Sequence, residues 1–193
     1  MNDSNFKLRN FDNPSIFFRF EDKFKWFLMG PLIYNPYFKK LGLKGNEHVL
    51  DFGSGGGVGS RGILKNLNGN GHLTCVDSSI YWINKSSSRL KKFGNVNFRH
   101  GDIRKLNIPS SSIDVISIIH VLHDIPPNDR QSTVFALVKT LKKTGIFCIV
   151  EPTRTSHGMP VSEIRELLLR VGLKETECII KKSRYQGKFR FET

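Results

Sequence analysis

An alternating run of glycines offers the clearest chemistry in this sequence. The run, Asp51-Phe-Gly53-Ser54-Gly55-Gly-Gly57, directly follows an apolar stretch that predicts a buried strand. Glycines lack a Cβ atom, so the backbone of such a turn approaches a ligand closely and directs its N–H groups toward it. The spacing therefore predicts a binding loop at the carboxyl end of a strand.

A carboxylate lies where it would complete this site. Asp77 ends the next apolar stretch, 20 positions after Gly57, and its oxygens accept hydrogen bonds from both hydroxyls of a ribose. No Gly-Lys-Ser/Thr follows the glycines, which excludes a phosphate-binding P-loop. The dinucleotide spacing at Gly57, Gly59 and Gly62 begins too far beyond the strand to favour a nicotinamide or flavin. The pattern predicts another nucleoside-containing cofactor.

Two histidines and an acid follow a later apolar stretch. His120, His123 and Asp124 come at the end of an expected strand, where a general base can take a proton from a bound substrate. The histidines are three positions apart and face opposite sides of an extended chain, so we expect only one to point at the acceptor. Glu151, before Pro152, is a further candidate base.

These residues must be positioned by alternating strands and helices. Strands are expected at His48–Phe52, His72–Asp77, Val96–His100, Asp114–Leu122 and Gly145–Val150, all buried. Helices are expected at Gly59–Asn68, Ser79–Phe93, Asn128–Lys143 and Val161–Val171. Two further strands, Leu173–Lys181 and Tyr185–Glu192, predict an antiparallel finish. The alternation is typical of an α/β doubly wound parallel sheet.

The first 45 residues differ from the rest, and we expect residues 1–45 to form helices that lie over a domain of residues 46–193. Phe11–Leu43 is rich in aromatic and basic residues, with breaks near Gly30-Pro31 and Asn35-Pro36. One alternative is that the aromatics only pack the helix onto the sheet. Another is that this helix lies in a membrane interface, with a lipid headgroup as acceptor.

The run from Asp51 to Gly57 resembles the acid-x-Gly-x-Gly-x-Gly first motif of class I S-adenosylmethionine-dependent methyltransferases, of the small single-domain type. The resemblance extends over about residues 44–193. It implies a Rossmann-like, doubly wound sheet of seven mostly parallel strands with an antiparallel last strand. It also implies S-adenosylmethionine as cofactor, S-adenosylhomocysteine as product, and no metal.

The same resemblance implies that residues 1–45 form a helical substrate cap, because this segment commonly closes over the acceptor in the family, and that Tyr34 and Tyr37 bind the substrate. It also implies roles for other residues. Asp77 would bind the ribose, the acid of Gly101-Asp102-Ile103 would face the adenine amino group, and His120 would form a wall of the pocket. The cofactor-binding set is Asp51, Gly53, Ser54, Gly55, Gly57, Asp77, Ser78, Asp102, Ile103 and His120. His123-Asp124 resembles the His-Asp pair of plant-type small-molecule O-methyltransferases, in which the histidine is the base. His123 and Asp124 are therefore the expected catalytic residues.

The absence of certain motifs limits the chemical class of the methyl acceptor. No Asn/Asp-Pro-Pro-Tyr follows the fourth expected strand, and no Asp-Asn pair follows the fifth. These absences disfavour amino-methylating enzymes for nucleobases and magnesium-dependent catechol-type enzymes, and favour methylation of a small molecule at O or N. Alternatives are a methyltransferase acting on nucleic acid, argued from the basic stretch Lys85–Lys105, and a domain that binds the cofactor without catalysis.

Composition agrees with a single soluble domain. The 193 residues carry a formal net charge of +13, and 38% are hydrophobic, which excludes global disorder. No apolar run is long enough to span a bilayer, and the first ten residues lack the apolar core of a signal peptide. We expect Cys75, Cys148 and Cys178 to be reduced core thiols, in keeping with a cytoplasmic location. The oligomeric state is left open.

Overall fold

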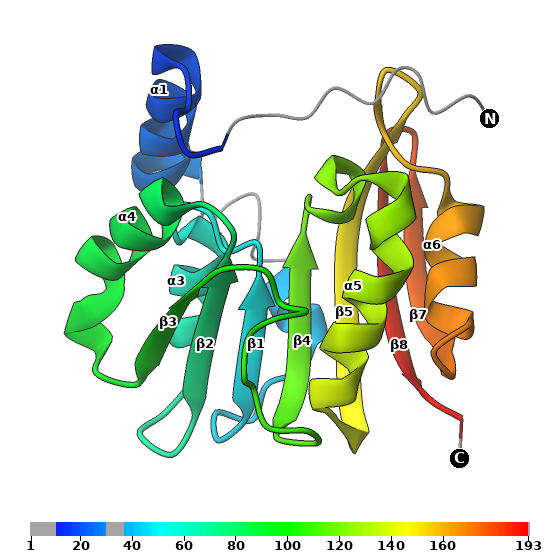
Figure 1. Ribbon diagram of the computed structural model, residues 1–193. Coiled ribbons are helices and arrows are strands. Elements are labelled where there is room, and N and C mark those ends of the chain that lie inside the picture. Colours follow the sequence, from blue (N-terminus) through cyan, green and yellow to red (C-terminus); the bar gives the residue numbers. More distant parts are fainter. Residues whose placement is uncertain (1–10, 30–36, 193) are drawn as a thin grey trace. The chain divides into compact units, whose positions relative to one another are not determined.

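The computed structural model describes residues 11–29 and 37–192 (Figure 1). The described chain divides into two compact units. Residues 11–106 contain the glycine run and are called the glycine-loop unit. Residues 107–192 contain His120, His123 and Asp124 and are called the histidine unit.

Three parallel strands form the sheet of the glycine-loop unit, in the order β3-β2-β1. They are β1 (His48–Phe52), β2 (His72–Asp77) and β3 (Val96–His100), and the helices between them are α3 (Val58–Leu64), α4 (Ile80–Leu90) and the short 3-10 helix η3 (Lys91–Phe93). Asp51 pairs with Cys75 and Asp77 with His100. The register therefore places the carboxyl ends of the strands at one edge of the sheet.

β3 is exposed, contrary to the buried strand that its sequence predicted. No residue of Val96–His100 is fully buried, whereas Val49 and Leu50 of β1 are completely inaccessible. The reason is the strand order: β3 is the outermost strand of this unit and has a neighbour on one side only. α3 is also shorter than expected and ends at Leu64 rather than Asn68.

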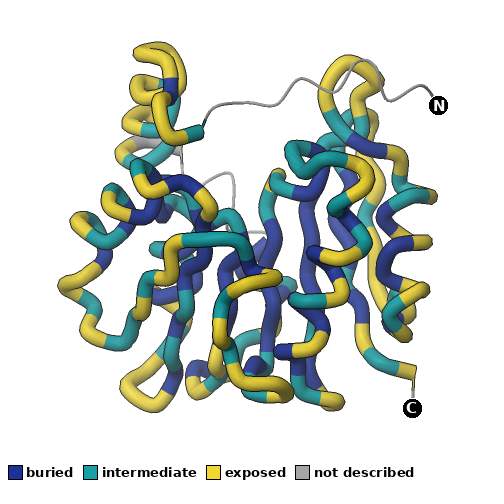
Figure 2. Tube along the Cα trace, in the orientation of Figure 1, coloured by how far each residue is buried: buried dark blue, intermediate teal, exposed yellow. Residues whose placement is uncertain are grey.

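An exposed helix precedes this sheet. α1 (Ile16–Phe24) begins after Ser15, whose side chain accepts a hydrogen bond from the Phe18 N–H, and continues into the π-helical turn η2 (Lys25–Met29). No residue of α1 is buried (Figure 2), and Phe17 is 73% exposed. The alternative that the aromatic residues only pack the helix onto the sheet is therefore wrong for α1.

The histidine unit has a mixed sheet in the order β4-β5-β8-β7. Its strands are β4 (Ile113–Ile119), β5 (Leu141–Arg154), β7 (Leu173–Lys181) and β8 (Arg184–Phe191), with the two-residue β6 (His157–Gly158) beside the end of β5. β4 and β5 are parallel, and β8 is antiparallel to both β5 and β7, which confirms the expected antiparallel last strand. Its helices are η4 (Leu122–Asp124, 3-10), α5 (Pro127–Thr140) and α6 (Val161–Leu169).

Several expectations for the histidine unit were wrong. α5 ends at Thr140 rather than at Lys143, because residues 141–143 already belong to β5, which was expected to begin only at Gly145. β4 ends at Ile119, before the expected Leu122, because the chain turns at His120 and enters η4. Cys178 is exposed, whereas Cys75 and Cys148 are buried core thiols. Cys178 lies on β7, the outermost strand of this unit, most of whose residues face solvent. Within the described residues, no helix has both the length and the apolar character needed to cross a membrane.

Candidate active site

The glycine loop folds back on β2 directly after β1 ends. The N–H groups of Gly53 and Ser54 both donate to the carbonyl of Val76, at 2.8 and 3.1 Å. Gly53, Gly55 and Gly57 all have positive φ angles, of 69°, 52° and 83°. L side chains rarely adopt this backbone conformation, so the alternating glycines are required by the path of the loop itself.

Asp77 is bound to the loop by backbone hydrogen bonds. The Gly55 N–H donates to Asp77 Oδ2 at 2.8 Å, and the Ser79 N–H donates to Oδ1 at 2.9 Å. Burial raises the pKa of Asp77, and the two N–H donors partly oppose that rise. Each carboxylate oxygen has a second lone pair, so Asp77 can still accept hydrogen bonds from two ribose hydroxyls. The carboxylate therefore fits the ribose-binding role.

The rest of the loop also fits a ligand. A Cβ atom built on Gly55 meets open space, so the backbone there is approachable. The buried hydroxyl of Ser54 makes no hydrogen bond within ordinary distance and angle limits in the described part of the chain. Asp51 is different, because its buried carboxylate accepts a hydrogen bond of 2.6 Å from the Ser60 hydroxyl on α3. Asp51 thus fixes the start of α3, and its direct contact with a cofactor remains a prediction.

Asp102 lies in the loop after β3. The Gly101 N–H donates to the Asp77 carbonyl at 2.9 Å, which holds this loop against the end of β2. Arg104 binds both oxygens of Asp102, and these hydrogen bonds lower the pKa of Asp102. Ile103 is buried and Ser78 is exposed. The structure thus brings these predicted residues to the same strand ends as Asp77.

An ion-pair cluster attaches α1 to the glycine loop. Asp22 of α1 contacts Lys85 and Arg89 of α4, each at 2.8 Å. Arg89 also donates to the carbonyl of Gly56 in the loop, at 2.7 Å. Trp26, in η2, lies within 4.6 Å of the Arg89 guanidinium, measured to the ring centroid. Charge and a cation–π contact therefore hold a helix that buries none of its own residues.

The chain ahead of α1 reaches the residues that follow Asp77. Ser79 donates to the Phe11 carbonyl at 2.8 Å, and the Ile80 N–H donates to the Asp12 carboxylate at 2.9 Å. Tyr37 is buried, with its ring edge-on to Phe38. Tyr34 lies outside the described residues. The roles of both tyrosines in substrate binding remain predictions.

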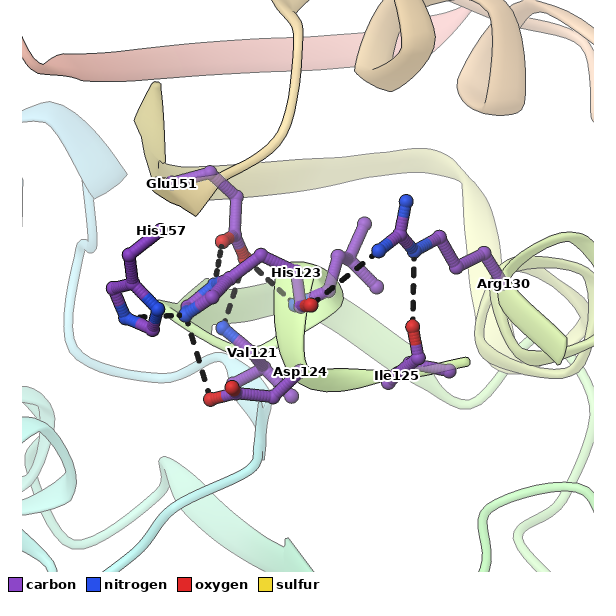
Figure 3. A network of polar contacts seen from close by, with 8 residues as sticks. Val121, His123, Asp124, Ile125, Arg130, Glu151 and His157 are labelled. Atoms are coloured by element: carbon purple, nitrogen blue, oxygen red, sulfur yellow. Dashed lines mark hydrogen bonds and ion pairs between the residues drawn. The ribbon is translucent and has the colours of Figure 1, made fainter. Parts of the chain in front are cut away.

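In the histidine unit, His123 is the centre of a polar cluster (Figure 3). Its Nδ1 lies 2.6 Å from Glu151 Oε2, and its Nε2 lies 3.1 Å from His157 Nε2 and 3.4 Å from Asp124 Oδ2. The side chain of His123 is 3% exposed and that of Glu151 is fully buried. An ionised carboxylate only accepts hydrogen bonds, so His123 Nδ1 carries the proton and the neutral ring has its lone pair on Nε2.

Hydrogen bonds from the backbone hold the Glu151 carboxylate in place. Its Oε1 accepts hydrogen bonds from the N–H groups of Val121 and Leu122, both at 2.8 Å. Both oxygens are therefore engaged, which favours an orienting role over the role of base that the sequence also allowed. β5 supplies Glu151, and the turn into η4 supplies the donors.

Arg130 stabilises the same turn from α5. Its guanidinium donates to the carbonyls of Ile125 and His123, at 3.0 and 3.3 Å, and forms an ion pair with Glu163 of α6. Sequence reasoning missed Arg130 and also His157. Neither lies in a motif, and the only signal for His157 was a histidine shortly after the fifth expected strand.

His120 differs from His123 in exposure and backbone conformation. It is exposed and has a φ of +59°, which is uncommon for a residue with a Cβ atom. Its N–H donates to the Val150 carbonyl at 2.8 Å, which fixes the bend after β4. Its contact with the cofactor remains a prediction.

Comparisons with known proteins agree with this architecture. A demethylmenaquinone methyltransferase of Leptospira interrogans is 34% identical over 108 residues, which are 53% of this chain and 42% of that protein. A ubiquinone/menaquinone biosynthesis C-methyltransferase of Campylobacter jejuni is 28% identical over 94 residues, 49% of this chain and 39% of that protein. The chain thus matches about two fifths of the length of these relatives.

A solved structure resembles nearly the whole chain. A SAM-dependent methyltransferase from Aquifex aeolicus superimposes with a TM-score of 0.74 at 19% identity, covering 92% of this chain and 97% of that one. The sheet, the glycine loop and the acid at the end of β2 define a class I, Rossmann-like S-adenosylmethionine-dependent methyltransferase. The family described as "Methyltransferase domain" matches residues 49–145, and the chain belongs to that family.

Proposed function

We propose that this chain transfers the methyl group of S-adenosylmethionine to a small molecule that carries an ionisable hydroxyl group on a ring. The observation that carries the proposal is the buried pair of His123 and Glu151, with Nδ1 and Oε2 2.6 Å apart. This pair directs a lone pair on His123 Nε2 away from Glu151, as a general base requires. An acceptor that must lose a proton makes use of such a base.

Proton removal from the acceptor and methyl transfer are coupled in the proposed step. The cofactor supplies an electrophilic methyl carbon on a sulfonium. His123 Nε2 takes the hydroxyl proton, and Glu151 stabilises the resulting imidazolium. The electron pair released on the acceptor forms the new bond to the methyl carbon, while the bond between sulfur and methyl breaks and its electrons remain on sulfur. Asp124 Oδ2 lies 3.4 Å from Nε2, so its negative charge is close to the imidazolium that the step forms.

Ionising a ring hydroxyl spreads negative charge over the oxygen and the conjugated ring carbons, so the same base serves transfer to either atom. When a ring carbon is methylated, that carbon then loses its hydrogen as a proton to water, and the imidazolium returns its proton to the ring oxygen, which restores the aromatic hydroxyl. The names of the two relatives, both quinone-related, favour a reduced quinone as the acceptor and carbon as the methylated atom. We therefore propose transfer to ring carbon, while the O or N transfer that the sequence favoured stays a prediction.

The charge distribution bears on the nucleic-acid alternative. Within Lys85–Lys105, three cations are in ion pairs: Lys85 and Arg89 with Asp22, and Arg104 with Asp102. The basic stretch is thus partly neutralised by the chain itself, which weakens the argument for a phosphate-binding surface.

The test uses S-adenosylmethionine with a tritiated methyl group and offers a reduced naphthoquinone lacking its ring methyl, phosphatidylethanolamine vesicles, or tRNA. We expect label in the quinol. His123→Ala should lower kcat about 100- to 10,000-fold, the typical effect of general-base catalysis, with cofactor affinity unchanged. His48→Ala, an exposed histidine at the start of β1, is the matched control. Label in lipid or tRNA alone, or full kcat in His123→Ala, would overturn the proposal.

A further inference from the structure

We propose that His123, Asp124 and His157 bind one divalent transition-metal ion, Zn²⁺ above all. The three side chains offer one ligand atom each, and these atoms all lie within 4.8 Å of one another. The proposal goes beyond methyl transfer and does not rest on it, but Zn²⁺ would occupy the Nε2 lone pair of His123 that the proposed base uses, so the metal-bound chain should not transfer methyl groups. Two imidazoles and a carboxylate form a donor set that suits zinc, with the fourth position open for water or another ligand.

The spacing of the ligand atoms supports the site. Two imidazole nitrogens bound tetrahedrally to Zn²⁺, each about 2.0–2.1 Å from the metal, lie about 3.3 Å apart. The Nε2 atoms of His123 and His157 are 3.1 Å apart, and His123 Nε2 is 3.4 Å from Asp124 Oδ2. Both separations match the edge of such a tetrahedron. The two rings are nearly perpendicular, at 89°, with their centroids 4.4 Å apart, so one ring meets the other edge-on rather than by stacking.

The electrostatics point the same way. Because Glu151 accepts the proton on His123 Nδ1, the neutral ring presents a lone pair at Nε2. The carboxylate oxygen of Asp124 likewise presents only lone pairs. His123 Nε2 and Asp124 Oδ2 lie 3.4 Å apart, and His157 Nε2 lies 3.1 Å from the same nitrogen. A cation between them would accept a lone pair from each of the three side chains.

The surroundings are those of a supported metal ligand. Zinc-bound histidines commonly donate their other ring N–H to a carboxylate, which fixes the ring and strengthens the ligand. Glu151 is that carboxylate, and it is held in turn by two backbone N–H groups. His157 is presented by the hairpin in which β5 pairs with β6, and it is exposed, which provides an entry path.

Zinc binding is tested on chain freed of metal with EDTA, without cofactor or acceptor. Zn²⁺ is titrated by calorimetry against a competing chelator, and Co²⁺ is followed by its visible absorption. We expect one ion per chain and the intense Co²⁺ bands of a four-coordinate site. His157→Ala and Asp124→Asn should each weaken binding about 100-fold or more, and Glu151→Gln about 10- to 100-fold.

Two control variants separate this site from other metal-binding groups. His48→Ala changes a histidine outside the histidine unit, and Cys178→Ser removes the exposed thiol; neither should alter zinc affinity. Circular dichroism checks that each variant is folded. Equal zinc affinity in the wild type and His157→Ala, or loss of binding in Cys178→Ser, would overturn the proposal. Because no methyl transfer is measured, failure here leaves the proposed function standing, and failure of that function leaves the zinc result standing.

Discussion

Asp22 of α1 and Arg89 of α4 are joined by two contacts, Nη2 to Oδ2 at 2.8 Å and Nη1 to Oδ1 at 3.2 Å, although they are 67 positions apart in the sequence. The same Nη1 donates to the carbonyl of Gly56. One guanidinium therefore connects the N-terminal helix to the glycine loop. Since α1 buries no residue, this connection supplies much of what holds it in place.

Replacing Asp22 should release α1. Asp22→Asn removes the charge that pairs with Arg89 and Lys85, and hydrogen bonds to charged groups are each worth about 1.5–3 kcal/mol. We expect amide hydrogen exchange in Ile16–Phe24 to accelerate about 10- to 150-fold, with little change in the rest of the chain.

The control for this prediction is Glu21→Gln, in the same helix. Glu21 forms an exposed pair with Lys25, and such i,i+4 pairs contribute only about 0.3–0.5 kcal/mol. Equal exchange rates in Asp22→Asn and Glu21→Gln would show that the ion-pair cluster does not hold α1.

The glycine loop was predictable because its requirements are local. The glycines at positions 53, 55 and 57 indicate the positive φ angles that the loop adopts there. The acid at the end of β2 follows at a fixed spacing. The hydrogen bond from the Gly55 N–H to Asp77 then follows, because parallel strands end at one edge of the sheet. Local rules were thus enough to predict the loop and the position of Asp77, the acid expected to bind the ribose.

The histidine cluster was only half predictable. His123 and Asp124 lie directly after β4 and were visible as a pair. Glu151 could be seen as an acid at the end of β5, but its contact with His123 depends on which way each side chain points. His157 depends on a two-residue strand, and Arg130 on the packing of α5 against the turn. Neither has a sequence signal of its own, because tertiary contacts position both.

Cofactor affinity should fall at low pH because of Asp77. Burial raises the pKa of Asp77 above its ordinary value of 3.8, so the carboxylate takes up a proton at a higher pH than an exposed aspartate does. A protonated carboxyl cannot accept from both ribose hydroxyls. We expect S-adenosylmethionine affinity, measured by calorimetry from pH 7 downward, to decrease as Asp77 is protonated.

Asp77→Asn should weaken binding by about 1–3 kcal/mol at neutral pH and remove this pH dependence. Asp102→Asn is the comparison, because Arg104 lowers the pKa of Asp102 and its titration falls in a lower range. A parallel decline of affinity in Asp77→Asn and the wild type would assign the effect to another group.

Arg130 should position His123 without touching the cofactor loop. Arg130→Met removes donors to two carbonyls of the turn and leaves Glu163 without its ion-pair partner. We expect a loss of about 1–3 kcal/mol in the free energy of unfolding, measured in urea, and a lower kcat with unchanged cofactor affinity. Arg130→Lys keeps the charge but cannot form the same fork of hydrogen bonds, so it should restore stability more than kcat. Full kcat in Arg130→Met would show that the turn needs no support.

Acid should destabilise the chain through Glu175. Arg165 of α6 binds both oxygens of Glu175 on β7, at 2.7 and 2.9 Å, and the Tyr185 hydroxyl donates to one of them at 2.8 Å. These contacts lower the pKa of Glu175 from 4.5 to about 2, with the Arg165 hydrogen bonds as the largest cause. A carboxylate whose folded pKa is depressed contributes stability above its unfolded pKa and loses it as pH falls to the folded value.

The stabilisation should therefore be complete above about pH 4.5 and disappear toward pH 2. Because Arg165 is nearly half exposed, solvent screens the pair, and we expect a contribution of about 1–2 kcal/mol rather than the full value of the shift. Urea unfolding between pH 6 and pH 2 measures it. Glu175→Gln should flatten this part of the profile, whereas Glu166→Gln, in an exposed pair with Arg170, should leave it unchanged. If the wild type and Glu175→Gln lose stability equally over this range, the contacts between α6 and β7 do not control acid stability.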